Sequence, residues 1–112
     1  MRLKHMVGIG CAVVLILTGF SAASTADPRV GIHIFQFRPG RLEISTGTKV
    51  TWINQDDITH TVTSGTPDTR DGRFDQQLEG RNTAITIEFK EPGVYPYFCG
   101  KHPSMRGEIR VN

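Results

Sequence analysis

The sequence predicts an all-β fold, a Greek-key β-sandwich of about seven to eight strands. Short segments rich in β-branched and aromatic residues alternate between apolar and polar side chains, and turns rich in Gly, Pro and Asp separate them. No helical 3.6-residue periodicity is found beyond the N-terminal apolar run. Many short strands separated by turn residues are typical of a sandwich.

The expected strands follow one another from residue 31 to the C-terminus. In order they are GIHIFQF (31–37), RLEIS (41–45), KVTWIN (49–54), ITHTVTS (58–64), TAITIEF (83–89), VYPYFC (94–99) and GEIRV (107–111). The apolar parity of the first segment changes at Ile34 and Phe35, which indicates a bulge or a change of sheet. Trp52 alternates with Val50 and is predicted to lie in the core.

The connections between these strands carry two further expectations. The stretch Ser64–Gly80 is polar and rich in Gly and Asp, so it is predicted to be the longest irregular segment, anchored to the core by Phe74 and Leu78. Either Tyr95 or Tyr97 is expected to form a tyrosine-corner hydrogen bond rather than to relay electrons.

The N-terminus has the three-part pattern of a secretory signal peptide. A basic start, MRLKH, is followed by the apolar run MVGIGCAVVLILTGF and the small residues SAASTA. The run covers 15 residues, fewer than the roughly 20 of a membrane span, and an uncleaved membrane anchor is the alternative. We therefore expect residues 1–26 to be a signal peptide, cleaved after Ala23 or Ala26. Residues 27–112 would form one exported, periplasmic domain with no membrane span.

The charge of the exported domain excludes some partners. The whole chain has 13 basic and 11 acidic residues, and removal of Arg2 and Lys4 with the leader makes the two counts equal. Without a basic face, nucleic acid is not an expected partner, and a monomer is the default. A mixed, solvated surface is expected where acidic and basic residues interleave, at Asp56, Asp57, Asp68, Asp71, Asp75 and Glu79 with Arg70, Arg73 and Arg81.

Cysteine usage points to a metal. Cys99 is the only cysteine of residues 27–112, so the exported domain has no internal disulfide. A domain of this size buries only about 60% of its surface and usually needs an additional stabilising element. An unpaired thiol is also a liability in an oxidising compartment. Both features are explained if the thiolate binds a metal ion that stabilises the fold.

The segment CGKHPSM places Cys99, His102 and Met105 three residues apart. Cys99 is expected to end one strand and Met105 to begin the last, so the segment forms the turn of a hairpin. Gly100 and Pro103 favour a tight turn in which the three donors point at a common centre.

A fourth donor comes from an earlier strand. His60 ends the run DDITH, 39 residues before Cys99, and a sandwich can bring it alongside. Two imidazoles and a thiolate in a plane, with a weak axial thioether, are the ligands of blue copper electron-transfer sites. Zinc favours four good ligands, and methionine is a poor fourth. Because the protein fills every strong position, a carrier is expected rather than an enzyme. His33 is expected to be a strand residue, not a ligand.

Four blocks of the chain resemble one family. They are FRPGRLEI, GTKVTWINQDDITHTV, DGRFD and EPGVYPYFCGKHPSMRGEIRV, between Phe37 and Val111. These blocks resemble the small blue-copper cupredoxins of the plastocyanin/amicyanin family, and the short gap between His102 and Met105 is similar to amicyanin. The resemblance implies a cupredoxin-like fold and one copper ion cycling between Cu(I) and Cu(II). It also implies that redox protein partners dock near the exposed edge of His102. The ligands it implies are His60, Cys99, His102 and Met105.

The sequence departs from the family pattern in two places, and these limit which properties of the family are expected here. Thr61 stands where amicyanin and plastocyanin usually have an asparagine that ties this loop to the cysteine loop, although a hydroxyl can also donate and accept a hydrogen bond. The Ser64–Gly80 stretch is unlike amicyanin, so amicyanin's amine dehydrogenase partner is not expected here.

The function expected from the sequence is that of an exported mononuclear type 1 copper protein that shuttles single electrons between redox partners. The alternative is a copper-binding or delivery protein with the same fold. A metal-free adhesion sandwich would leave the four donors unexplained. A nucleophilic pair of Cys99 and His102 would lack a third, orienting group.

Overall fold

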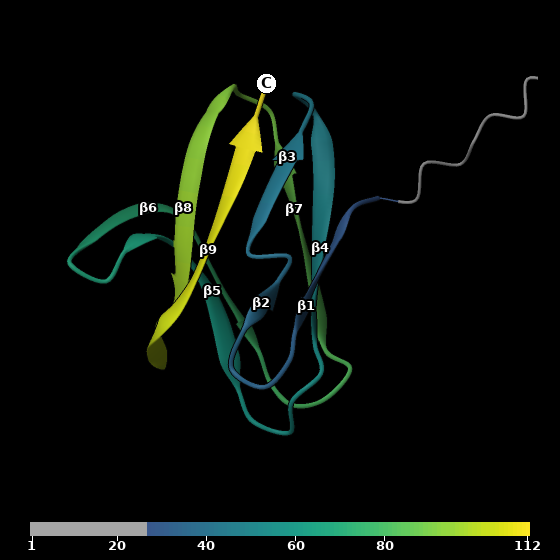
Figure 1. The fold of residues 1–112 in the computed structure, drawn as a ribbon, viewed down its shortest axis with the longest axis vertical. Helices are drawn as coiled ribbons and strands as arrows, with labels where there is room; N and C mark the ends of the chain where they lie inside the picture. The colour runs from purple at the N-terminus through teal and green to yellow at the C-terminus, as the bar shows by residue number, and fades with distance from the viewer. Residues whose placement is uncertain (1–26) are drawn as a thin grey trace, which may run out of the picture.

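Two β-sheets packed face to face form the domain in the computed structural model, which describes residues 27–112 (Figure 1). The strands are β1 (Arg29–Ile32), β2 (Phe37–Arg38), β3 (Arg41–Ile44), β4 (Thr48–Asn54), β5 (His60–Thr66), β6 (Thr69–Leu78), β7 (Ala84–Phe89), β8 (Gly93–Cys99) and β9 (His102–Val111). The predicted signal peptide and its cleavage sites lie outside the described residues. Within residues 27–112, no helix is long and apolar enough to cross a membrane.

The strand order confirms the predicted all-β sandwich. One sheet has the order β2-β1-β4-β7 and the other β3-β9-β8-β5-β6, nine strands in place of the expected seven to eight. The pairs β1–β4 and β3–β9 are parallel, and the other pairs are antiparallel. The chain therefore passes between the two sheets instead of completing one before the other.

The first predicted strand, residues 31–37, is in fact a hairpin. His33 and Gln36 exchange two backbone hydrogen bonds of 3.0 and 3.2 Å around Ile34 and Phe35, whose φ angles are 47° and 56°. Two central residues with positive φ are typical of the two-residue turn that joins antiparallel strands. The change of parity in the sequence therefore marks a turn and not a bulge.

The prediction of an irregular segment at Ser64–Gly80 is wrong. Most of it belongs to the hairpin of β5 and β6 (Figure 1). β6 is the edge strand of its sheet, so nearly all its side chains are exposed and no apolar alternation marks it. The two predicted anchors are confirmed, because Leu78 is buried and Phe74 packs against the core.

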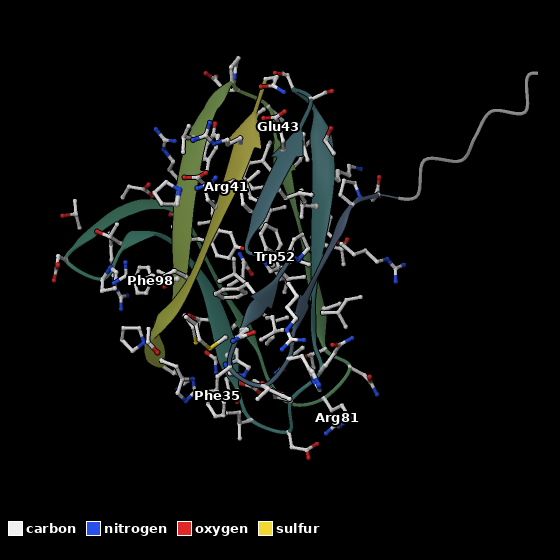
Figure 2. All side chains as sticks on the ribbon, in the orientation of Figure 1. Phe35, Arg41, Glu43, Trp52, Arg81 and Phe98 are labelled. Carbon is white, nitrogen blue, oxygen red and sulfur yellow. The ribbon has the colours of Figure 1, made fainter. Side chains whose placement is uncertain are left out.

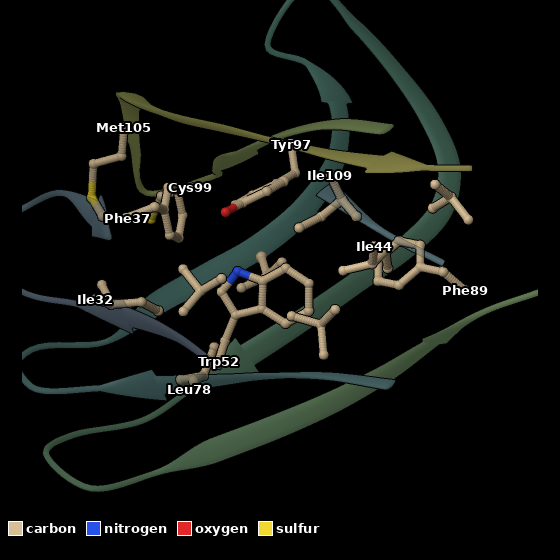
Figure 3. Packing of buried hydrophobic residues seen from close by; sticks show 14 residues of the cluster. Ile32, Phe37, Ile44, Trp52, Leu78, Phe89, Tyr97, Cys99, Met105 and Ile109 are labelled. Atoms are coloured by element: carbon tan, nitrogen blue, oxygen red, sulfur yellow. The ribbon is translucent and has the colours of Figure 1, made fainter. Parts of the chain in front are cut away.

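Trp52 lies at the centre of the core, as predicted (Figures 2 and 3). Its ring meets the Tyr97 ring edge-on, with centroids 5.4 Å apart, and packs near Phe89. The expected tyrosine corner is made by Tyr95, whose hydroxyl donates to the Glu91 carbonyl at 2.7 Å. Burial raises the pKa of Tyr97 to about 12, so its hydroxyl stays neutral inside the core.

Tyr97 depends on a glycine in the neighbouring strand. It pairs with Gly107 across β8 and β9, and its ring lies in the space that a side chain at Gly107 would occupy. A Cβ at Gly107 would overlap the Tyr97 ring, which is held by Trp52 and Phe37 and cannot move aside.

We therefore expect Gly107→Ala to destabilise the apo domain by about 1–3 kcal/mol, the usual cost of an overpacked core. Thermal unfolding followed by circular dichroism measures it. Gly40→Ala is the matched control, because the nearest atom to its added Cβ is the Phe37 carbonyl oxygen at an ordinary 3.7 Å. Equal melting temperatures for the two variants would contradict this account of the packing.

Candidate metal centre

Three connections meet at the end of the sandwich opposite the C-terminus (Figure 1). They are the β1–β2 turn, the β4–β5 loop and the β8–β9 turn. All the donors singled out in the sequence are carried by strands that begin or end here. The site is therefore built from strand ends, whose positions are set by the sheet hydrogen bonds.

The β8–β9 hairpin turns more tightly than the sequence indicated. Cys99 ends β8 as predicted, but β9 begins at His102, so only Gly100 and Lys101 form the turn. The pairing shifts register between Phe98 and Cys99, and this shift makes Cys99 the partner of His102. The thiol and the imidazole are thus brought to one place by the hairpin itself.

His60 reaches the thiol through strand pairing. It is the first residue of β5, which lies beside β8 in the same sheet. The pairing of β5 with β8 brings His60 beside Cys99, although 39 residues separate them in the sequence, as predicted. Both side chains are fully buried.

The donor atoms of His60, Cys99 and His102 all lie within 4.8 Å of one another. Each imidazole presents Nδ1 to the Cys99 sulfur at 3.7 Å, which is too long for a strong hydrogen bond. Since metal–nitrogen and metal–sulfur bonds are about 2.0 and 2.3 Å long in zinc proteins, this spacing can accommodate one ion bonded to the three atoms. Met105 is buried at the same end of the core as Cys99 (Figure 3).

Thr61 ties the β4–β5 loop to the β8–β9 turn. Its backbone N–H donates to the Cys99 sulfur at 3.3 Å, and its hydroxyl accepts the Gly100 N–H at 2.6 Å. Two further hydrogen bonds extend this network. The Thr61 hydroxyl bonds that of Thr63 at 2.8 Å, and the Thr63 hydroxyl bonds the Asp75 carboxylate at 2.9 Å. Because a carboxylate only accepts, each hydroxyl donates toward Asp75 and accepts from the other side.

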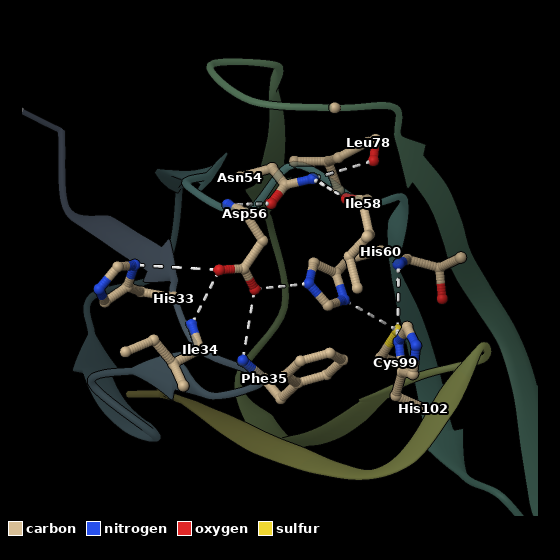
Figure 4. Close-up of polar contacts among 12 residues, drawn as sticks. His33, Ile34, Phe35, Asn54, Asp56, Ile58, His60, Leu78, Cys99 and His102 are labelled. Atoms are coloured by element: carbon tan, nitrogen blue, oxygen red, sulfur yellow. Dashed lines mark hydrogen bonds and ion pairs between the residues drawn. The ribbon is translucent and has the colours of Figure 1, made fainter.

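Asp56 belongs to the site and not to the mixed, solvated surface predicted for it. Its Oδ2 lies 2.8 Å from His60 Nε2 (Figure 4). Burial raises the pKa of the Asp56 carboxyl, but the hydrogen bonds from Ile34 N, His60 and Phe35 N outweigh it and hold that pKa below its ordinary value. Its position four residues before His60 was the available signal. The surface expectation is met by Asp57, which pairs with Arg81 at 2.9 Å.

Asn54 holds the loop that carries Asp56. It is fully buried, and its amide nitrogen donates to the carbonyls of Ile58 and Leu78 at 2.7 and 3.2 Å. Its Oδ1 accepts the Asp56 N–H at 2.9 Å. These bonds fix the path of the β4–β5 loop as it approaches His60.

One aromatic ring, that of Phe35, covers the end of the site. The edge of Phe35 meets the His102 ring with centroids 4.9 Å apart and the His60 ring at 5.7 Å. His102 is half-buried, whereas the other three donors are buried. The prediction that His33 is a strand residue is wrong, because it follows Ile32, the last residue of β1. Its Nδ1 lies 3.9 Å from Asp56 Oδ1, and the cluster of donors consists of His60, Cys99 and His102.

Several known proteins are similar to this chain in sequence and in fold. The Cupredoxin-like domain family matches residues 8–111. Amicyanin from Paracoccus denitrificans is 30% identical over 94 residues, which are 82% of this chain and 72% of that protein. A solved Cu(I) form of an amicyanin mutant has a TM-score of 0.68 and 30% identity, and the match covers 83% of this chain and 90% of that one.

A purple cupredoxin from Nitrosopumilus maritimus has a TM-score of 0.70 at 29% identity, and the match covers 77% of this chain and all of that chain, 100%. The resemblance to amicyanin inferred from the sequence is thus confirmed by both sequence and fold. With a family match over most of its length and these relatives, the chain belongs to the cupredoxin-like domain family.

Proposed function

We propose that this protein binds one copper ion through His60, Cys99, His102 and Met105 and carries single electrons between redox partners. The observation that carries the proposal is the convergence of two imidazole Nδ1 atoms on one buried thiol sulfur. This donor set, with a buried thioether nearby, suits copper better than zinc. The likeness to an amicyanin solved in a Cu(I) form supports the same metal.

Copper supplies a one-electron couple at such a site. The residues of the chain hold their positions in both oxidation states because strand pairing and burial fix them. Cys99 would bind as a thiolate, which the Thr61 N–H stabilises. His60 and His102 would supply the two imidazole nitrogens, and Met105 would offer a weak axial sulfur. A rigid donor set favours rapid electron exchange since little has to rearrange.

A carrier is favoured over a copper delivery protein by the burial of the site. Cys99, His60 and Met105 are inaccessible, so the metal could leave only by way of the half-buried His102. All the donors come from the protein, which leaves no strong position for a substrate and argues against an enzyme. Resistance of the loaded protein to a copper chelator over hours would support the carrier, and rapid loss would support delivery.

We propose that redox partners dock at the end of the domain beside His102. Ile34, Phe35 and Ile58 are large apolar residues exposed there, and Phe35 touches the His102 ring. The pattern of the N-terminal sequence supports export to the periplasm, where such partners would be met.

Cys99→Ser should abolish the intense visible absorption expected of a copper–thiolate bond, because serine removes the sulfur and changes little else. The measurement is a visible spectrum of residues 27–112 titrated with Cu(II) and then reduced with ascorbate. The unmodified protein should become coloured at one equivalent and bleach reversibly. Colour that persists in the variant would refute the assignment of Cys99.

Met105→Leu should keep copper bound but raise the reduction potential, because a weak donor to Cu(II) is lost while the buried volume is kept. Ile109→Leu is the control, since Ile109 is also buried in β9 and offers no donor. Redox titration of both variants tests the assignment. A lower potential for Met105→Leu would count against an axial Met105.

Copper should raise the melting temperature of the apo domain, because an ion that binds only the folded state adds its binding free energy to stability. At about a thousandfold excess over the dissociation constant, the gain is roughly 4 kcal/mol. Calorimetry with and without one equivalent of copper measures the shift, and Cys99→Ser should show a smaller one. An unchanged melting temperature would show that the metal does not stabilise this fold.

A further inference from the structure

The Asp56 carboxylate connects His60 to the turn that covers the site (Figure 4). Oδ2 lies 2.8 Å from His60 Nε2 and 3.3 Å from the Phe35 N–H, and Oδ1 accepts the Ile34 N–H at 2.9 Å. The side chain is only 14% exposed. A carboxylate in this position is held by three donors and has little freedom to turn away from the imidazole.

We propose that Asp56 is a positioning residue of the metal centre, which holds His60 in the orientation and tautomer that bind the metal and lowers the reduction potential of the bound ion. The inference rests on the proposed function, since it concerns the same site. It assigns Asp56 a role that neither the donor set nor the family match requires.

The contact with Asp56 fixes the position of the proton on His60. An ionised carboxylate only accepts hydrogen bonds, so the imidazole must donate to it from Nε2. The lone pair is then left on Nδ1, the atom that faces the Cys99 sulfur at 3.7 Å. Asp56 therefore selects the one neutral tautomer of His60 that can bind an ion beside Cys99.

The negative charge of Asp56 affects the reduction potential of the bound ion. A carboxylate that accepts from the far nitrogen of a ligand histidine raises the basicity of the ligating nitrogen. Both that effect and the negative charge itself favour the more positive ion, Cu(II), over Cu(I). Asp56 is therefore expected to strengthen Cu(II) binding more than Cu(I) binding, which lowers the potential.

Asp56 also holds the β1–β2 turn, which covers the site. Ile34 and Phe35 both have positive φ, a conformation that bulky residues rarely adopt and that the surroundings must hold. The Asp56 carboxylate accepts both of their N–H groups. The turn then presents the Phe35 ring to His60 and His102. One carboxylate thus orients a ligand and holds the aromatic cover over both imidazoles.

Asp57 provides a matched control for this role. It is the next residue, but its side chain is 78% exposed and it pairs with Arg81 at 2.9 Å, away from the imidazoles. Asp56→Asn and Asp57→Asn remove the same charge from neighbouring positions with almost no change in shape. Only the first of them alters a contact to His60.

The experiment measures Cu(II) and Cu(I) dissociation constants and the reduction potential of the two variants and the unmodified protein at pH 7. Loss of such a supporting carboxylate typically weakens metal binding by about 10- to 100-fold, and we expect this for Cu(II) in Asp56→Asn. Each tenfold loss that spares Cu(I) raises a one-electron potential by about 59 mV. Asp57→Asn should shift the potential far less, and equal shifts for the two variants would overturn the proposal.

Nitrogen-15 NMR of the unmodified Cu(I) form tests the hydrogen bond without any variant. The expected result is a proton on His60 Nε2 that exchanges slowly with water. A rapidly exchanging proton would refute the role of Asp56, even if Asp56→Asn failed to fold. If the unmodified protein gave no copper–thiolate absorption, the proposed function would fail instead, so the two failures are distinct.

Discussion

The site depends on the burial of one thiol at the end of β8. Cys99 is the only cysteine of residues 27–112 and is fully buried, with two imidazole nitrogens facing its sulfur at 3.7 Å. Buried polar atoms are costly unless they find partners, and the two imidazole–sulfur contacts are longer than good hydrogen bonds. A metal ion bonded to all three atoms, as proposed, would satisfy them together and would help to stabilise a small domain without a disulfide.

The β4–β5 connection supports this arrangement from two sides. After Asn54 fixes its path, Asp56 contacts the outer nitrogen of His60, and His60 itself begins β5. The next residue, Thr61, donates to the Cys99 sulfur and accepts from Gly100. A single short segment therefore supplies one imidazole and holds both that imidazole and the thiol loop. Changes in this segment should affect His60 and Cys99 together, because the segment carries the imidazole and its Thr61 bonds the thiol and the turn after it.

The four donors differ in how deeply they are buried. His60, Cys99 and Met105 are closed off by the sandwich, whereas His102 is half-buried beneath Phe35. Phe35 is itself 50% exposed, so the apolar surface beside His102 is continuous with the cover over the imidazoles. Electron exchange through this end would need no opening of the core. The protected donors and the exposed contact surface are thus separate parts of one structure.

Apolar alternation and close spacing are local properties, so the strand-rich fold, the central Trp52 and the hairpin that carries Cys99, His102 and Met105 could be predicted from the sequence. It also indicated His60, since a sandwich brings distant strands together. The contact of Asp56 with His60, the covering turn at Ile34 and Phe35, and the strands within Ser64–Gly80 become visible only in the folded chain. Those features depend on which strands and loops become neighbours. An edge strand whose side chains are mostly exposed leaves no periodic signal in the sequence. The partner of a carboxylate such as Asp56 is likewise set by the path of its loop, which no local pattern records.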